Sequence, residues 1–106
     1  DGLMPYEITA INTARIAYNV TIKAAADADP NLALYDASAF MTELKANGIS
    51  FGTGDITSTY ATGGGFSLDG VHPTARGYSV IANGIIDTIN TAFNSSIPRV
   101  DPGTYT

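Results

Sequence analysis

The sequence predicts an α/β protein, and three features of the 106-residue chain support this prediction. Residues 5–26 carry apolar side chains at the period of a helix. A short apolar run over residues 32–35 (LALY) follows, and a second helical pattern begins after Asp36. Helix, strand and helix in this order are typical of a parallel sheet flanked by helices. Because one strand does not make a sheet, we expect the other strands to lie outside this chain or to come from a partner.

The composition fits one domain at most. Hydrophobic residues make up 44% of the chain, which is enough for a core and argues against disorder. Five basic and ten acidic residues give a net charge of −5. This balance disfavours nucleic acid as a partner, because phosphates bind clusters of Lys and Arg. The chain has no cysteine, which excludes disulfides, thiolate nucleophiles and Cys-ligated zinc.

The chain carries no apolar signal segment. The sequence has no apolar stretch long enough to span a bilayer, so we expect no membrane span in this chain. It begins at Asp1 rather than at a methionine, and the loop-like start indicates an internal point of a longer protein.

The first predicted helix runs from about Pro5 to about Ala26. Proline suits a first helical turn, where its missing N–H costs nothing. The apolar residues that follow recur near the 3.6-residue period: Ile8, Ile11, Ala14, Tyr18 and Ile22. Residues 27–31 (DADPN) have turn chemistry, and Pro30 prevents continuation.

A buried strand over residues 32–35 and a second helix are predicted next. Asp36 or Ser38 offers the N-cap, and Asn47-Gly48 is a strong stop signal. The buried face of this helix is expected to hold Phe40, Met41 and Leu44. Residues 49–60 fit a short β-hairpin or an excursion loop, and the glycines at 63–65 indicate a further loop.

The third predicted helix opens at residues 72–74 (HPT), with Pro73 near its first position. Its expected buried face holds an apolar series at helical spacing: Tyr78, Ile81, Ala82, Ile85, Ile89 and Phe93. The asparagines of this region, Asn83, Asn90 and Asn94, are expected to face solvent. The helix should end near residues 94–96, and residues 97–106 should form an extended tail.

The only histidine, His72, follows Asp69 by three residues. Residues at this spacing can face each other in a turn or a first helical turn. The carboxylate of Asp69 can then hold one ring nitrogen of His72 and leave the other as a base. The alternative is a chance pair that only caps a helix. Metal binding is disfavoured, because one histidine and scattered carboxylates offer too few ligands for zinc.

The segment around this pair resembles a family motif. Residues 66–78 (FSLDGVHPTARGY), followed by Ile81-Ala82-Asn83, resemble the last conserved block of the SGNH (GDSL-type) hydrolases. The flanking segments Ala17-Tyr18-Asn19, Leu34-Tyr35-Asp36 and 97–102 (IPRVDP) are also similar to the C-terminal part of that family. The resemblance covers nearly the whole chain and is strongest from Phe66 to Asn83.

The resemblance implies that residues 1–106 are the C-terminal segment of a single flavodoxin-like, three-layer α/β/α domain. It implies a hydrolase of acyl or acetyl esters of lipids or carbohydrates that needs no cofactor. His72 matches the general base of the family and Asp69 its orienting acid. By analogy with the family, export to the periplasm, the cell surface or the medium is plausible.

The nucleophile and the oxyanion-hole residues of that family have no match here. No serine lies in a G-D-S sequence, and the nearest segment, residues 54–57 (GDIT), has no serine. We therefore expect this chain alone to be inactive and the missing N-terminal part of the domain, or a separate chain, to be its partner. A non-catalytic binding or structural module within a larger assembly is the alternative.

Further candidates lie close to the pair in sequence. Phe66, Ser67 and Tyr60 are expected to line a substrate mouth. Arg76, one turn after His72, is a candidate for contact with an anionic or sugar substrate, and a solvent-exposed helix-face arginine is the alternative.

Overall fold

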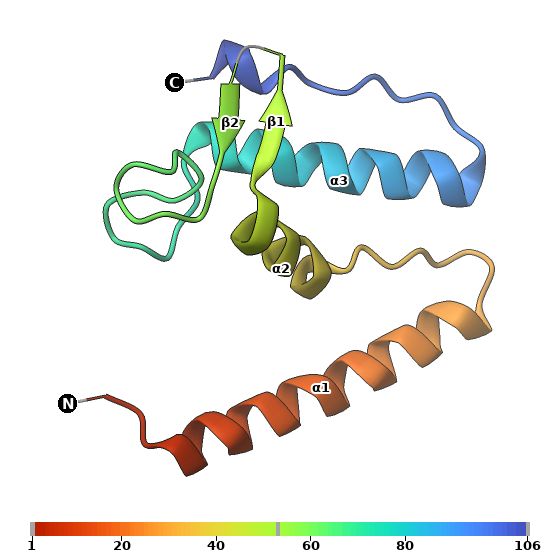
Figure 1. The fold of residues 1–106 in the computed structure, drawn as a ribbon. Helices are drawn as coiled ribbons and strands as arrows, with labels where there is room; N and C mark the ends of the chain where they lie inside the picture. The colour runs from red at the N-terminus through yellow and green to blue at the C-terminus, as the bar shows by residue number, and fades with distance from the viewer. Residues whose placement is uncertain (1, 53, 106) are drawn as a thin grey trace. The chain divides into compact units, whose positions relative to one another are not determined.

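The computed structural model describes residues 2–52 and 54–105. These form two compact units, an N-terminal unit (Asp1–Leu34) and a C-terminal unit (Tyr35–Thr106), each taken by itself below. The elements in chain order are α1 (Pro5–Ala28), α2 (Ala37–Asn47), β1 (Ile49–Phe51), β2 (Gly54–Ile56), α3 (Ala75–Phe93) and the 3-10 helix η1 (Pro102–Thr104) (Figure 1).

The N-terminal unit is built on α1, the predicted first helix. The Glu7 carboxylate accepts a hydrogen bond from the Met4 backbone N–H at 2.7 Å, which satisfies one free donor at the helix start. The helix continues to Ala28, slightly beyond the predicted end. Pro30 explains the stop, because proline disfavours helical backbone in the residue before it. None of the residues of α1, all of which the structure describes, is buried.

The predicted α/β fold is wrong. Residues 32–36 form no strand, and Leu32 and Leu34 are exposed. Within the described ranges, the one sheet is the two-stranded antiparallel pair β1–β2, so the chain is mostly helical and is not a flavodoxin-like three-layer α/β/α domain. A short apolar run becomes a strand only where neighbouring strands pair with its backbone N–H and C=O groups. In the described chain no such neighbour lies beside residues 32–36.

Helix α2 begins and ends at the predicted signals. The Asp36 carboxylate accepts a hydrogen bond from Ala39 N at 2.9 Å, and Gly48 follows the helix with a φ of 68°. The hairpin then pairs Ile49 with Ile56, and Phe51 with Gly54. Of the two forms predicted for residues 49–60, the hairpin is therefore correct for its first part.

The core of the C-terminal unit is small. Its buried hydrophobic residues are Leu44 of α2, Ile56 of β2 and Val80 of α3. Partly buried hydrophobic side chains pack around these three: Phe40, Ile49, Phe51 and Phe66. The core therefore joins α2, the hairpin and α3, and the loop that contains Phe66 closes over it.

Helix α3 begins two residues later than predicted and buries a different face. Thr74 is the N-cap, and Pro73 precedes it. The buried residues are Gly77, Ser79, Val80 and Asn83, whereas Tyr78, Ile85 and Phe93 of the predicted apolar face are exposed. The other members of that face, Ile81, Ala82 and Ile89, are partly buried, so the predicted apolar face is only partly covered within the described residues.

The C-terminal segment runs back along α3 (Figure 1). The side-chain amide of Asn83 donates to Val100 O and accepts from Val100 N, both at 2.8 Å. Asn90 pairs with Ile97 O and N in the same way, both at 2.9 Å. The prediction that both asparagines face solvent is wrong. The C-terminal segment is extended but pairs with no strand, and the two amides hydrogen-bond to its backbone N–H and C=O groups instead. Asn94 is exposed at the end of α3, as predicted.

Candidate functional site

The candidate site lies in a tight loop that leads into α3. The two arms of the loop are joined by a bridge between Phe66 and Pro73 and by the Ser67 N–H, which donates to His72 O at 2.7 Å. At the tip, Gly70 N donates to Ser67 O at 3.0 Å, and Gly70 adopts a φ of 71°. A positive φ of this size is cheap for glycine and strained for other residues. The sequence therefore places its glycine where the loop reverses.

Tyr60 supports this loop from outside. Its hydroxyl donates to Leu68 O at 2.7 Å, and its ring lies beside Gly70. A Cβ atom at position 70 would meet the ring at 3.5 Å, which is ordinary contact distance. The backbone of the tip is thus held by a side chain from the preceding loop.

Asp69 divides its hydrogen bonds between its two oxygens. Oδ1 accepts from Ser67 Oγ at 2.7 Å, Val71 N at 2.8 Å and His72 N at 2.9 Å. Oδ2 lies 2.6 Å from His72 Nδ1. The loop thus brings the two residues singled out by the sequence into direct contact through their side chains.

The same contacts fix the charge of the carboxylate. The Ser67 hydroxyl, the Val71 N–H and the two His72 groups all stabilise the ionised form and hold the pKa of Asp69 well below its usual value. An ionised carboxylate can only accept, so the neutral imidazole presents its N–H at Nδ1. Nε2 is then left with a lone pair, which is the state a general base requires.

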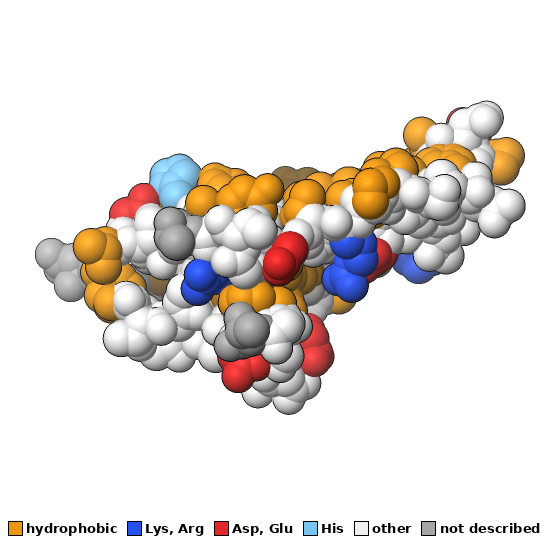
Figure 2. Space-filling model, turned by 90° about the horizontal axis from the view of Figure 1, so that it is seen from above, with side chains coloured by type: hydrophobic (Ala, Val, Ile, Leu, Met, Phe, Trp, Pro, Cys, Tyr) orange, Lys and Arg blue, Asp and Glu red, His pale blue; other side chains and the backbone are white. Residues whose placement is uncertain are grey.

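The pair is open to solvent. The side chains of His72 and Asp69 are 73% and 51% exposed. Figure 2 shows the pale blue histidine on the surface beside an acidic side chain, with hydrophobic side chains nearby. The exposed apolar residues of the loop itself are Leu68 and Val71, which alternate with Asp69 and His72. The accessible Nε2 atom therefore lies in a partly apolar surface.

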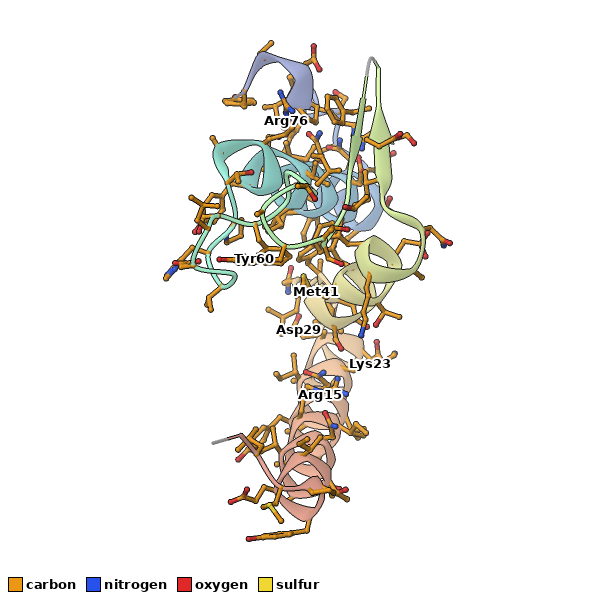
Figure 3. All side chains as sticks on the ribbon, turned by 60° about the vertical axis from the view of Figure 1, so that its left-hand side comes forward. Arg15, Lys23, Asp29, Met41, Tyr60 and Arg76 are labelled. Atoms are coloured by element: carbon orange, nitrogen blue, oxygen red, sulfur yellow. The ribbon has the colours of Figure 1, made fainter. Side chains whose placement is uncertain are left out.

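The other candidate residues have different places from those predicted. Phe66 packs against the core, and the Ser67 hydroxyl faces Asp69. Arg76 is half-buried and donates from Nε to Tyr105 O at 3.0 Å and Pro102 O at 3.3 Å. Its guanidinium lies 5.3 Å from the centre of the Phe51 ring. Arg76 is thus not a free helix-face arginine, and its contacts lie at the C-terminal segment and the hairpin rather than at His72. In Figure 3 it lies beside η1.

Sequence reasoning missed the role of Ser67 toward Asp69. The signal was present as a serine two residues before the aspartate, a spacing at which a hydroxyl can reach a carboxylate in a turn. The spacing alone does not show whether the hydroxyl turns toward the carboxylate or toward solvent, because the closure of the loop decides it.

Across residues 2–52 and 54–105, no three His, Asp or Glu side chains gather closely enough to hold a metal ion. In the same residues, no helix is both long enough and apolar enough to cross a bilayer.

Comparisons of the chain with models of known protein families, with curated proteins and with solved structures found no match.

Proposed function

We propose that this chain supplies the general base and the orienting acid of a serine ester hydrolase whose nucleophile lies on another segment or another polypeptide. The observation that supports this proposal is the 2.6 Å contact between Asp69 Oδ2 and His72 Nδ1, made by an ionised carboxylate. The resemblance of residues 66–78 to the last block of the SGNH hydrolases is the second support.

The chemistry follows from the free Nε2 atom. Nε2 takes the proton of the serine hydroxyl as the serine oxygen attacks the ester carbonyl. Asp69 stabilises the imidazolium that forms, and Nε2 then gives the proton to the leaving alcohol. Water attacks the acyl-enzyme in the second half of the cycle, and the same nitrogen takes the water proton and returns it to the serine. The substrates we propose are acyl or acetyl esters of lipids or carbohydrates.

A non-catalytic binding module is the second candidate, and the exposed apolar side chains favour it. Leu68 and Val71 are exposed in the same loop as the pair, and Tyr78 and Ile85 are exposed on α3. A contiguous apolar surface is typical of a site that another molecule covers. In this reading the Asp69–His72 contact only shapes the loop.

The test uses the native protein together with any polypeptides that remain bound to it. We would measure hydrolysis of p-nitrophenyl acetate and butyrate, and labelling by a fluorophosphonate, which reacts with activated serines. We expect His72→Ala to lower turnover by about 10²–10⁴-fold, the usual contribution of a general base. Fluorophosphonate labelling should fall with it.

Asp55→Asn is the matched control, because Asp55 also accepts a hydrogen bond from a serine, Ser50, but lies in the hairpin. This variant should retain activity. Unchanged turnover in His72→Ala, or no reactive serine in any bound polypeptide, would refute the hydrolase and leave the binding module.

A further inference from the structure

We propose that Ser67 is a positioning residue, which orients the His72 imidazole by holding the Asp69 carboxylate through one oxygen. The effect of Ser67 on turnover rests on the proposed function. Its effect on the orientation and tautomer of the imidazole does not. Sequence position alone suggested contact with substrate, whereas the hydroxyl of Ser67 donates to Asp69 Oδ1 at 2.7 Å.

The first step in the argument is how the donors are distributed. Ser67 Oγ and the backbone N–H groups of Val71 and His72 all reach Oδ1, and Oδ2 has only His72 Nδ1. The terminal torsion of an aspartate is broad, so an exposed carboxylate rotates easily. Two of the three donors to Oδ1 come from the arm after Asp69, and Ser67 supplies the one from the arm before it. The carboxylate is therefore held between the two arms.

The second step is that Ser67 is itself fixed. Its N–H donates to His72 O at 2.7 Å, and its C=O accepts from Gly70 N at 3.0 Å. The backbone of Ser67 therefore holds the backbone of His72, while its side chain reaches the His72 ring through Asp69. Ser67 is thus connected to His72 twice. One connection is the direct backbone hydrogen bond, and the other runs from its hydroxyl through the Asp69 carboxylate to the imidazole.

The third step excludes the other role for this serine. Its hydroxyl proton points to Asp69 Oδ1, and the imidazole nitrogen on the Asp69 side, Nδ1, is itself a donor to the carboxylate. The Asp69 carboxylate has a lowered pKa and is too weak a base to take the proton of a serine hydroxyl, so Ser67 is not placed as the nucleophile. A nucleophile must approach Nε2 instead.

The experiment is ¹⁵N NMR of the imidazole in the 106-residue chain, in which His72 gives the only histidine signals. In the unsubstituted chain we expect the two ring nitrogens to be well separated, with the proton on Nδ1. Ser67→Ala should narrow this separation, as the tautomers mix, and the Nδ1 proton should exchange faster with water. Ser67→Thr keeps the hydroxyl and should restore both signatures.

Ser50→Ala is the matched control, because it removes the same kind of serine-to-aspartate bond from the hairpin. We expect no change at His72 in this variant, and the amide signals of α3 report whether each variant is folded. A folded Ser67→Ala chain with unaltered imidazole signals would overturn the proposal, as would a Ser50→Ala chain that changes them equally. Because the measurement needs no nucleophile, inactivity of the native protein refutes the hydrolase and leaves this result standing.

Discussion

Asp69 accepts four hydrogen bonds although its side chain is half exposed. Water competes for an exposed carboxylate, so each bond contributes less than it would in a buried site. Their combined effect is nevertheless to favour the charged form in the folded chain. The folded state therefore gains stability whenever Asp69 is ionised.

The sign of the pH dependence follows from the lowered pKa of Asp69. This contribution to stability is fully present above the unfolded pKa, about 4 for an aspartate, and is lost as the pH falls toward the lower folded pKa. We expect the free energy of unfolding of the unsubstituted chain to drop from about pH 5 to about pH 2 more steeply than that of Asp69→Asn. Urea titrations at several pH values measure both curves, and parallel curves would contradict the prediction.

At the scale of elements, the N-terminus of α3 positions the loop that carries Asp69 and His72. The Thr74 hydroxyl accepts from Gly77 N at 3.0 Å and donates to Gly64 O at 2.6 Å. A Cβ at Gly77 would lie 2.2 Å from Gly65 O, so only glycine lets the glycine-rich loop approach the helix this closely. The first turn of α3 is thus attached to that loop, and His72 lies two residues before the cap.

Removal of the cap should destabilise this junction. We expect Thr74→Ala to lower the free energy of unfolding by about 1–2 kcal/mol, since loss of an N-cap costs about this much. Thr88→Ala is the control, because the Thr88 hydroxyl only donates to Gly84 O within the same helix. Urea unfolding followed by circular dichroism compares the two, and equal losses would argue against a special role for the cap.

At the scale of the whole molecule, burial is concentrated in the C-terminal unit. The buried hydrophobic residues of the described chain, Leu44, Ile56 and Val80, all belong to that unit. The long α1 has none. Cooperative stability should therefore depend on the contacts of α2, the hairpin and α3.

Two isoleucine substitutions test whether stability depends on the buried residues of the C-terminal unit. Ile56 is 1% exposed and Ile11 of α1 is 54% exposed. We expect Ile56→Ala to cost about 2–5 kcal/mol, the usual effect of emptying a core site. Ile11→Ala should change stability by less than about 0.5 kcal/mol. Chemical denaturation of both variants measures the difference, and a comparable loss at Ile11 would mean that α1 is packed in solution.

Local signals in the sequence determined the three helices, the Asp36 cap and the stop at Gly48. They also determined that Asp69 and His72 meet. Each depends on hydrogen bonds or backbone preferences within a few residues, which the sequence displays directly. The resemblance to the hydrolase block also rests on a contiguous segment, and its functional meaning stays a prediction.

Only the tertiary structure decided what depends on distant neighbours. Whether residues 32–35 form a strand depends on partners for their backbone, which local pattern does not reveal. The buried face of α3 depends on which segments cover it, so Asn83 is 4% exposed and holds Val100, while the more apolar Tyr78 is exposed. The direction of the Ser67 hydroxyl likewise depends on the closure of the loop. Local propensity is set by adjacent residues, whereas burial is set by residues that only folding brings together.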